Sequence, residues 1–317
     1  MPKEPSAVGK VVDRVVACRH KSLPLSRSRS RLMTVPVRKS LPHPEGEVSC
    51  LVWEGAGPFL HFAHATGFNA ETYRGLLMPL SDRLRIAACD QRGHGFTTLP
   101  ATPDLPKGWT IYRDDLLRIL AQLDERPAIL AGHSMGATVS LMAASLRPER
   151  VRGLVLVEPV MVPLAAMILR YFTSQPNLAD RAEQRRDTFP SFDAALAAYT
   201  GRGAFKTWPI ETIAGYLRGG LIADSQAHVV RLACKPSWEA ATFRAAPYGK
   251  ARLARRVSCP ITVLYGTIAS TCRDSEVEVF KRAGARAVKI DGASHFLPME
   301  HPDRVREEIA RMAAETG

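Results

Sequence analysis

Short apolar runs alternate along the chain with longer segments whose apolar side chains recur at helical spacing. The apolar runs predict buried strands at residues 48–55, 58–65, 85–93, 127–134, 151–160, 259–266 and 285–295. Helical spacing and end signals predict helices at residues 109–125, 136–149 and 302–316. Strands that alternate with helices are typical of a mainly parallel sheet with helices on both faces. The predicted fold class is therefore α/β.

This alternation stops after residue 160. Residues 161–252 contain helical patches separated by Pro, Gly and Trp, and no segment among them has a convincing strand pattern. We therefore expect a helical cap, inserted into one α/β core that is made of residues 34–160 and 253–317.

Positive charge is concentrated near the N-terminus. The 317 residues carry a formal net charge of +12, and residues 1–40, with ten Lys or Arg and two acidic residues, supply +8 of it. Residues 1–33 include an Arg/Ser run and are expected to form a basic, disordered arm, and no nucleic-acid partner is expected. Met33 opens a stretch that reads like the start of a domain, which leaves open whether residues 1–32 belong to the natural protein.

Composition fits a globular protein, because apolar residues make up 46% of the chain and no apolar run reaches the roughly 18 to 20 residues of a membrane span. The six cysteines show no metal-like spacing, and no secretory signal is evident. Reduced thiols and a cytoplasmic location are the simplest expectation. The cysteines are Cys18, Cys50, Cys89, Cys234, Cys259 and Cys272.

The clearest chemical motif is AGHSMGA at residues 131–137. It places Ser134 between Gly132 and Gly136, where the predicted strand turns into the predicted helix. A G-x-S-x-G pattern at such a junction is typical of a nucleophile on a sharp turn, which exposes the serine hydroxyl above the sheet. A purely structural turn of small residues is the alternative.

A serine nucleophile needs a base. His295 follows the last predicted strand, and the carboxyl ends of parallel strands gather at one edge of a sheet, so His295 and Ser134 are expected to meet. Other histidines stand in turns where hydrogen bonding or surface exposure is the expected role. They are His64, His94, His133 and His301.

From about residue 34 to the C-terminus the sequence resembles the α/β-hydrolase fold superfamily, in its single-domain form with a helical cap. The resemblance depends on HATGF (64–68), DQRGHG (90–95), GHSMG (132–136) and SHFLPMEHP (294–302), in this order and spacing. It implies a nucleophile elbow at Ser134, a base at His295 and an oxyanion hole. The resemblance places the oxyanion donors at the backbone N–H groups of Met135 and Thr66, with Ala65 as the alternative to Thr66.

The resemblance leaves the third member of the triad open. Family members often carry an Asp three residues after the Gly that ends the strand following the cap, but Ala269 occupies that position after Gly266. A second known arrangement puts the acid at the end of the strand before the cap, where Glu158 ends an apolar run. A buried carboxylate is costly unless it is paired, which favours Glu158 as the acid. A loop-anchoring role for Glu158, with Asp274 as the acid, is the alternative.

The sequence therefore indicates a serine hydrolase that cleaves a small, mainly apolar ester or related acyl compound, with Ser134, His295 and Glu158 as the catalytic residues. A non-catalytic small-ligand-binding protein, a C–C hydrolase and a haloperoxidase-type enzyme on the same fold are alternatives. No phosphate-binding loop, dinucleotide fingerprint or metal-ligand cluster is recognisable, so no cofactor and no metal are expected. The expected partner is a small-molecule substrate, and a homodimer is left open.

Overall fold

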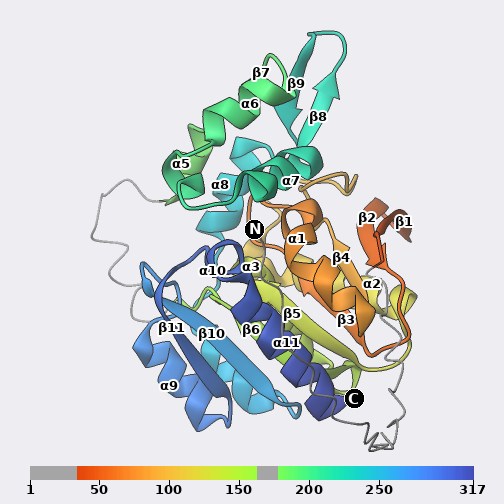
Figure 1. The fold of residues 1–317 in the computed structure, drawn as a ribbon, viewed down its shortest axis with the longest axis vertical. Helices are drawn as coiled ribbons and strands as arrows, with labels where there is room; N and C mark the ends of the chain where they lie inside the picture. Colours follow the sequence, from red (N-terminus) through yellow and green to blue (C-terminus); the bar gives the residue numbers. More distant parts are fainter. Residues whose placement is uncertain (1–33, 163–177) are drawn as a thin grey trace, which may run out of the picture. The chain divides into compact units, whose positions relative to one another are not determined.

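The computed structural model describes residues 34–162 and 178–317, and an eight-stranded sheet forms the centre of this part (Figure 1). The strand order is β1-β2-β4-β3-β5-β6-β10-β11. The strands are β1 (Val37–His43), β2 (Gly46–Trp53), β3 (Phe59–Ala63), β4 (Arg85–Cys89), β5 (Ala128–His133), β6 (Val151–Val157), β10 (Ile261–Ile268) and β11 (Arg286–Ser294). All seven predicted strands are present.

The sheet is mainly parallel, as predicted. Strands β4, β3, β5, β6, β10 and β11 run parallel to one another, whereas β1 and β2 pair antiparallel at one edge and β2 pairs antiparallel with β4. Strand β1 is not among the predicted strands. Its side chains are exposed or half-buried, so it lacks the apolar run that marks a buried strand.

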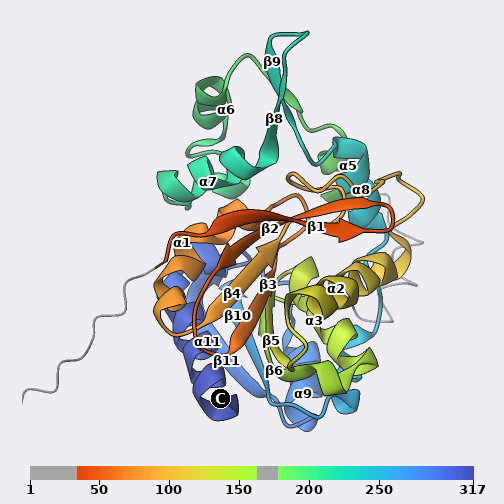
Figure 2. The same cartoon turned by 90° about the vertical axis from the view of Figure 1, so that its right-hand side faces the viewer.

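Helices cover both faces of the sheet (Figure 2). One face packs against α2, α3 and α9, and the other packs against α1 and α11, and each face has its own hydrophobic core. The prediction of an α/β fold with helices on both faces is confirmed. The helices are α1 (Arg74–Leu77), α2 (Thr110–Leu123), α3 (Met135–Leu146), α9 (Asp274–Arg282), α10 (Leu297–Glu300) and α11 (Pro302–Thr316).

Between β6 and β10 the chain leaves the sheet, and we call its described residues 178–249 the cap segment. This segment contains α5 (Leu178–Glu183), β7 (Thr188–Phe189), α6 (Phe192–Tyr199), α7 (Ile210–Gly220), β8 (Leu221–Asp224), β9 (Val229–Leu232) and α8 (Pro236–Arg244). The expectation that it holds no strand is wrong, because β7, β9 and β8 form a small antiparallel sheet. These strands have two to four residues each and are partly exposed, so they leave no apolar run in the sequence.

Hydrogen bonds attach the cap segment to loops at the carboxyl edge of the main sheet. Trp238 Nε1 in α8 donates to the carbonyl of Arg92, and Asn69 donates to the carbonyl of Tyr216 in α7. Trp238 is fully buried at this junction. The cap segment is therefore fixed over the edge where the predicted site residues lie. Part of the predicted cap, residues 163–177, falls outside the described residues.

Cys50 and Cys89 lie opposite each other in β2 and β4 and form a disulfide. The expectation of reduced thiols is wrong for this pair, because the two residues become neighbours only through strand pairing across 39 positions of sequence. Cys234, Cys259 and Cys272 carry free thiols, and Cys18 lies outside the described residues. Among the helices that the structure describes, none combines the length and apolarity needed to cross a membrane.

Candidate active site

Ser134 lies on the sharp turn between β5 and α3. Its backbone has φ 57° and ψ −118°, a region that non-glycine residues rarely adopt. Its backbone N–H donates to the carbonyl of Val157 in the neighbouring strand β6, at 3.0 Å. The neighbouring strand therefore helps to hold this turn in a conformation that places the serine at the carboxyl edge of the sheet.

Two glycines make room for this turn. A Cβ atom at Gly132 would lie 2.6 Å from the backbone of Gly136, and a Cβ atom at Gly136 would overlap the carbonyl group of Ala63 in β3. Both distances are far below van der Waals contact, so the close approach of α3 to the sheet requires glycine at both positions. The two glycines of the motif thus have a steric function in the turn itself.

The structure brings together the three residues that the sequence predicted as a triad. His295 Nε2 lies 3.1 Å from Ser134 Oγ, and His295 Nδ1 lies 3.3 Å from Glu158 Oε2. The three residues come from loops that follow β5, β6 and β11. The side chain of Glu158 is completely buried, whereas that of His295 is 21% exposed. A hydroxyl, an imidazole and a carboxylate are therefore connected in a line.

The loop after β10 holds the Glu158 carboxylate. The backbone N–H of Gly266, the hydroxyl of Ser270 and the backbone N–H of Thr271 all donate to it, the last two at 2.9 Å. Several donors that converge on one carboxylate fix its position and orientation. In this superfamily the triad acid often lies on the loop after β10. Here that loop instead binds the carboxylate of Glu158, which follows β6. Asp274, the alternative acid, is the first residue of α9, and no hydrogen bond joins it to His295 among the described residues.

Thr271 is a site residue that the sequence analysis missed. Its hydroxyl lies 3.2 Å from His295 Nδ1 and donates to the carbonyl of Glu158 at 2.9 Å. It can therefore accept the Nδ1 proton while donating its own proton elsewhere. The sequence carries no signal for this contact, because Thr271 and Glu158 are 113 residues apart and meet only through the pairing of β6 with β10.

Two backbone N–H groups near Ser134 are free to donate to an oxyanion. In the described part of the chain, the N–H groups of Thr66 and Met135 have no acceptor. The N–H of Ala65, by contrast, donates to the hydroxyl of Tyr73 at 3.2 Å, and that of Gly67 donates to His94 Nε2 at 3.0 Å. The structure thus favours Thr66 over Ala65 as the donor from this loop.

A buried hydrogen-bond chain connects the loops of the site. Tyr73 contacts His133 Nδ1 through its hydroxyl at 2.7 Å, and His133 Nε2 contacts the carbonyl of His295 at 2.7 Å. Since a carbonyl can only accept, His133 Nε2 carries the proton and Nδ1 accepts from Tyr73. Burial lowers the pKa of His133 well below its usual value, which keeps this tautomer neutral. His133 therefore links the Ala65–Thr66 loop, through Tyr73, to His295.

His64 and His94 have structural contacts of the same kind. His94 Nδ1 donates to the Arg92 carbonyl, and burial lowers the pKa of His94 to about 4. His64 Nε2 accepts from the backbone N–H of Gln91 at 2.8 Å, and burial lowers its pKa well below the usual value. Both imidazole rings are neutral, and their hydrogen bonds hold the loops around Ser134 in place.

Two adjoining cavities of about 250 Å³ each lie over Ser134 and His295. Both are walled by the loop of Thr66, by Leu178 and by Phe243 of the cap segment. The first is also walled by residues of both kinds, apolar and charged: Ala65, Phe68, Arg181, Ala182, Arg185, Ala204, Phe205, Glu239 and Phe296. The site can therefore take a small molecule next to the serine hydroxyl.

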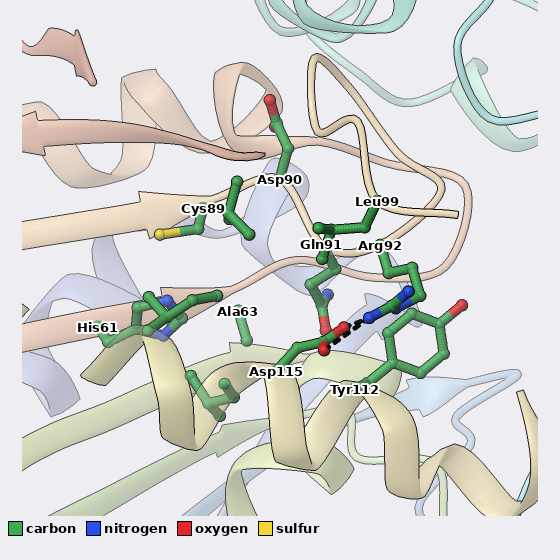
Figure 3. A pocket seen from close by; sticks show the side chains of 12 residues that line it. His61, Ala63, Cys89, Asp90, Gln91, Arg92, Leu99, Tyr112 and Asp115 are labelled. Carbon is green, nitrogen blue, oxygen red and sulfur yellow. Dashed lines mark hydrogen bonds and ion pairs between the residues drawn. The ribbon is translucent and has the colours of Figure 1, made fainter. Parts of the chain in front are cut away.

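A much smaller cavity lies between the sheet and α2 (Figure 3). It encloses about 10 Å³, which is near the lower limit for one water molecule. Figure 3 shows His61 at one end and the ion pair between Arg92 and Asp115 at the other. Neither Ser134 nor His295 lines it, so this cavity is separate from the candidate site.

Within the described residues, one group of acidic and histidine side chains is close enough to share a metal ion, namely His43, Glu45 and Asp115. Arg92 donates to both carboxylates, at 2.6 Å to Glu45 and 2.8 Å to Asp115, and so compensates their charge. We therefore assign no cation to this group.

A family model described as the alpha/beta hydrolase family matches residues 62–308. The chain belongs to the α/β hydrolase family. Among its relatives, the 2-(acetamidomethylene)succinate hydrolase of Mesorhizobium japonicum is 37% identical over 107 residues, or 33% of this chain and 37% of that protein. A putative non-heme haloperoxidase of Mycobacterium phage D29 is 34% identical over 109 residues, again 33% of this chain and 37% of that protein. The chain thus spans well under half the length of these relatives.

Solved structures agree with the fold. The crystal structure of E-2-(acetamidomethylene)succinate hydrolase superposes with a TM-score of 0.75 at 23% sequence identity, and the match covers 88% of this chain and 99% of that one. At this identity the likeness concerns the fold alone. It agrees with the α/β-hydrolase architecture that the strand order and the helices already indicate.

Proposed function

We propose that this member of the α/β hydrolase family is a serine hydrolase that cleaves acyl compounds through an acyl-enzyme. The observation that carries the proposal is the position of His295, whose Nε2 lies 3.1 Å from Ser134 Oγ while Nδ1 faces the buried Glu158 carboxylate at 3.3 Å. This is the arrangement of a nucleophile, a base and an orienting acid.

In the acylation step, Ser134 Oγ attacks the carbonyl carbon of the substrate and its proton passes to His295 Nε2. Negative charge develops on the carbonyl oxygen, and the N–H groups of Thr66 and Met135 stabilise it. The Glu158 carboxylate stabilises the imidazolium through Nδ1. When the bond to the leaving group breaks, His295 returns the proton to that group, and the acyl group stays on Ser134.

In the second step, a water molecule attacks the acyl carbon while His295 Nε2 takes its proton. The same two N–H groups stabilise the second oxyanion. The bond to Ser134 Oγ then breaks, His295 protonates the serine oxygen, and the acid product leaves. Ser134 and His295 then carry the same protons as before the first step, so the free enzyme is restored.

The walls of the cavity support a small acyl substrate. Phe68, Phe205 and Phe296 supply apolar surface, and the volume suits a compact molecule. The relative from Mesorhizobium japonicum is named as a hydrolase of a small acylated compound, which is in keeping with this substrate size. We propose esters and related acyl compounds as the substrate class.

Epoxide hydrolysis and ligand binding without turnover are less well supported. A relative is named as a haloperoxidase and another as an epoxide hydrolase. The epoxide hydrolases of this superfamily use an Asp nucleophile, whereas position 134 is Ser. Ala269, at the position where family members often carry the acid, would favour a non-catalytic binder, but the contact of Glu158 with His295 removes that support.

Labelling by a fluorophosphonate probe tests the nucleophile. Intact-mass measurement is expected to show one adduct on the wild type, none on Ser134→Ala and one on Ser140→Ala, a buried serine of α3 that does not line the cavities. Hydrolysis of 4-nitrophenyl butyrate is expected to follow the same order. A Ser134→Ala variant that labels and hydrolyses like the wild type would contradict the proposal, and so would a wild type that does neither.

A further inference from the structure

Two arginines of the cap segment lie in the wall of the cavity that contains Ser134 and His295. Arg181 is on α5, and Arg185 follows two residues after that helix. Arg181 is exposed to solvent, whereas Arg185 is half-buried. The contacts of the two side chains differ, and this difference indicates what the wall can bind.

Arg185 is fixed and charged. It donates to Glu239 at 2.8 Å and to the hydroxyls of Tyr199 and Tyr216. Burial alone would lower the pKa of Arg185, but Tyr216, Glu239 and Tyr199 together raise it well above the usual value. These contacts use four of the five N–H donors of the guanidinium, which leaves one donor on Nη1.

Arg181 has no such partners. No hydrogen bond or ion pair joins it to another of the described residues, and the acid that lines this cavity, Glu239, is already paired with Arg185. The lining therefore carries two positive charges and one negative charge. The excess of one positive charge lies in the same cavity as Ser134 and His295.

We propose that Arg181 and Arg185 form a carboxylate subsite, so that the preferred substrate is a small acyl compound with a carboxylate at its far end. This inference rests on the proposed function and names its substrate class. A carboxylate offers two acceptors in one plane, which match the free guanidinium of Arg181 and the remaining donor of Arg185. Phe68, Phe205 and Phe296 then contact the short chain between the carboxylate and the scissile acyl group.

A matched pair of esters tests the subsite. Mono-4-nitrophenyl glutarate carries the carboxylate, and its methyl ester has nearly the same shape without the charge. For each protein, the ratio of kcat/KM for the acid to kcat/KM for the methyl ester reports the selectivity. The wild-type ratio is expected to exceed 10, and Arg181→Gln is expected to lower it by about tenfold or more. Arg181→Lys should recover part of the loss.

Arg186 supplies the control. It is exposed, donates to the carbonyl of Thr188 and lies over the ring of Phe189, outside the cavity lining. Arg186→Gln removes the same charge from the same segment, and its ratio is expected to stay within about twofold of the wild type. Equal ratios for the wild type, Arg181→Gln and Arg186→Gln would overturn the subsite.

A direct binding measurement separates this inference from the proposed function. If the wild type hydrolyses the methyl ester but shows no preference for the acid, the subsite is wrong and the hydrolase stands. If it hydrolyses neither ester, the hydrolase fails, and calorimetry of glutarate with Ser134→Ala and with Ser134→Ala/Arg181→Gln decides the subsite. Binding that weakens at least tenfold in the double variant supports it, and equal or absent binding overturns it.

Discussion

Thr271 Oγ1 lies 3.2 Å from His295 Nδ1, as close as the Glu158 carboxylate, which lies at 3.3 Å. His295 therefore has two oxygen acceptors within reach of Nδ1. One is charged, and the other is a hydroxyl that also donates to the Glu158 carbonyl. Both oxygens can hold the His295 ring at Nδ1, and this fixes the direction in which Nε2 faces Ser134.

Thr271→Val removes this hydroxyl but keeps the shape of the side chain. We expect kcat for 4-nitrophenyl butyrate to fall about 3- to 10-fold, which corresponds to the roughly 0.5–1.5 kcal/mol of one hydrogen bond. Thr271→Ser restores the hydroxyl and should recover most of the rate. If Thr271→Ser is as slow as Thr271→Val, the methyl group and not the hydroxyl matters, and the positioning role is wrong.

Glu158→Gln replaces the buried carboxylate by a neutral amide of the same size. The amide can present its NH₂ to His295 Nδ1 and so favour the wrong tautomer, and kcat is expected to fall by roughly 10³- to 10⁴-fold. Asp274→Asn is the comparison, because Asp274 was the alternative acid and has no hydrogen bond to His295. Steady-state kinetics that show the large loss in Asp274→Asn, and not in Glu158→Gln, would reverse the assignment.

The fold could be predicted because buried strands leave apolar runs and the parallel order follows from strand–helix alternation. The family model and the fold of related structures confirm this part. Strands β1, β7, β8 and β9 could not be predicted, since they lie at edges or in a small exposed sheet where side chains need not be apolar.

The candidate site likewise has residues that could be predicted from the sequence and contacts that could not. Ser134, His295 and Glu158 each lie at or near the end of a predicted strand, so their meeting at one edge was predictable from topology, while their catalytic roles stay a prediction. Thr271 could not be predicted, because its contacts join loops far apart in sequence. The disulfide of Cys50 and Cys89 depends on strand register in the same way, and cysteine spacing carries no trace of it.

Gly136→Ala tests the steric requirement of the serine turn. The added Cβ would overlap the Ala63 carbonyl, which is backbone and cannot move aside easily. Overpacking of this kind costs about 1–3 kcal/mol of unfolding free energy, or a fall in Tm of roughly 2–10 °C. Gly75→Ala is the control, because a Cβ there meets nothing within 4 Å. Equal Tm values for the two variants in calorimetry would show that the turn relaxes without cost.

His61 should make the protein less stable in acid. Both of its ring nitrogens lack a partner among the described residues, and burial lowers its pKa to about 4. The unfolded chain, with a histidine pKa near 6.5, then binds a proton that the folded chain does not. Stability is therefore complete above pH ~6.5 and falls as the pH drops towards 4, by about 3 kcal/mol for this one residue.

His61→Leu removes this titration and fills the same buried position with an apolar side chain. Between pH 7.5 and pH 4.5 the unfolding free energy of His61→Leu should fall less than that of the wild type, by about 2–3 kcal/mol. His94, whose pKa burial also lowers to about 4, still titrates in the variant, so part of the acid loss remains. His228→Asn changes an exposed histidine of the β8–β9 turn and should lose as much as the wild type. Urea unfolding at the two pH values measures all three proteins, and an acid loss in His61→Leu equal to that of the wild type would mean that the folded protein accepts the proton at His61 without penalty.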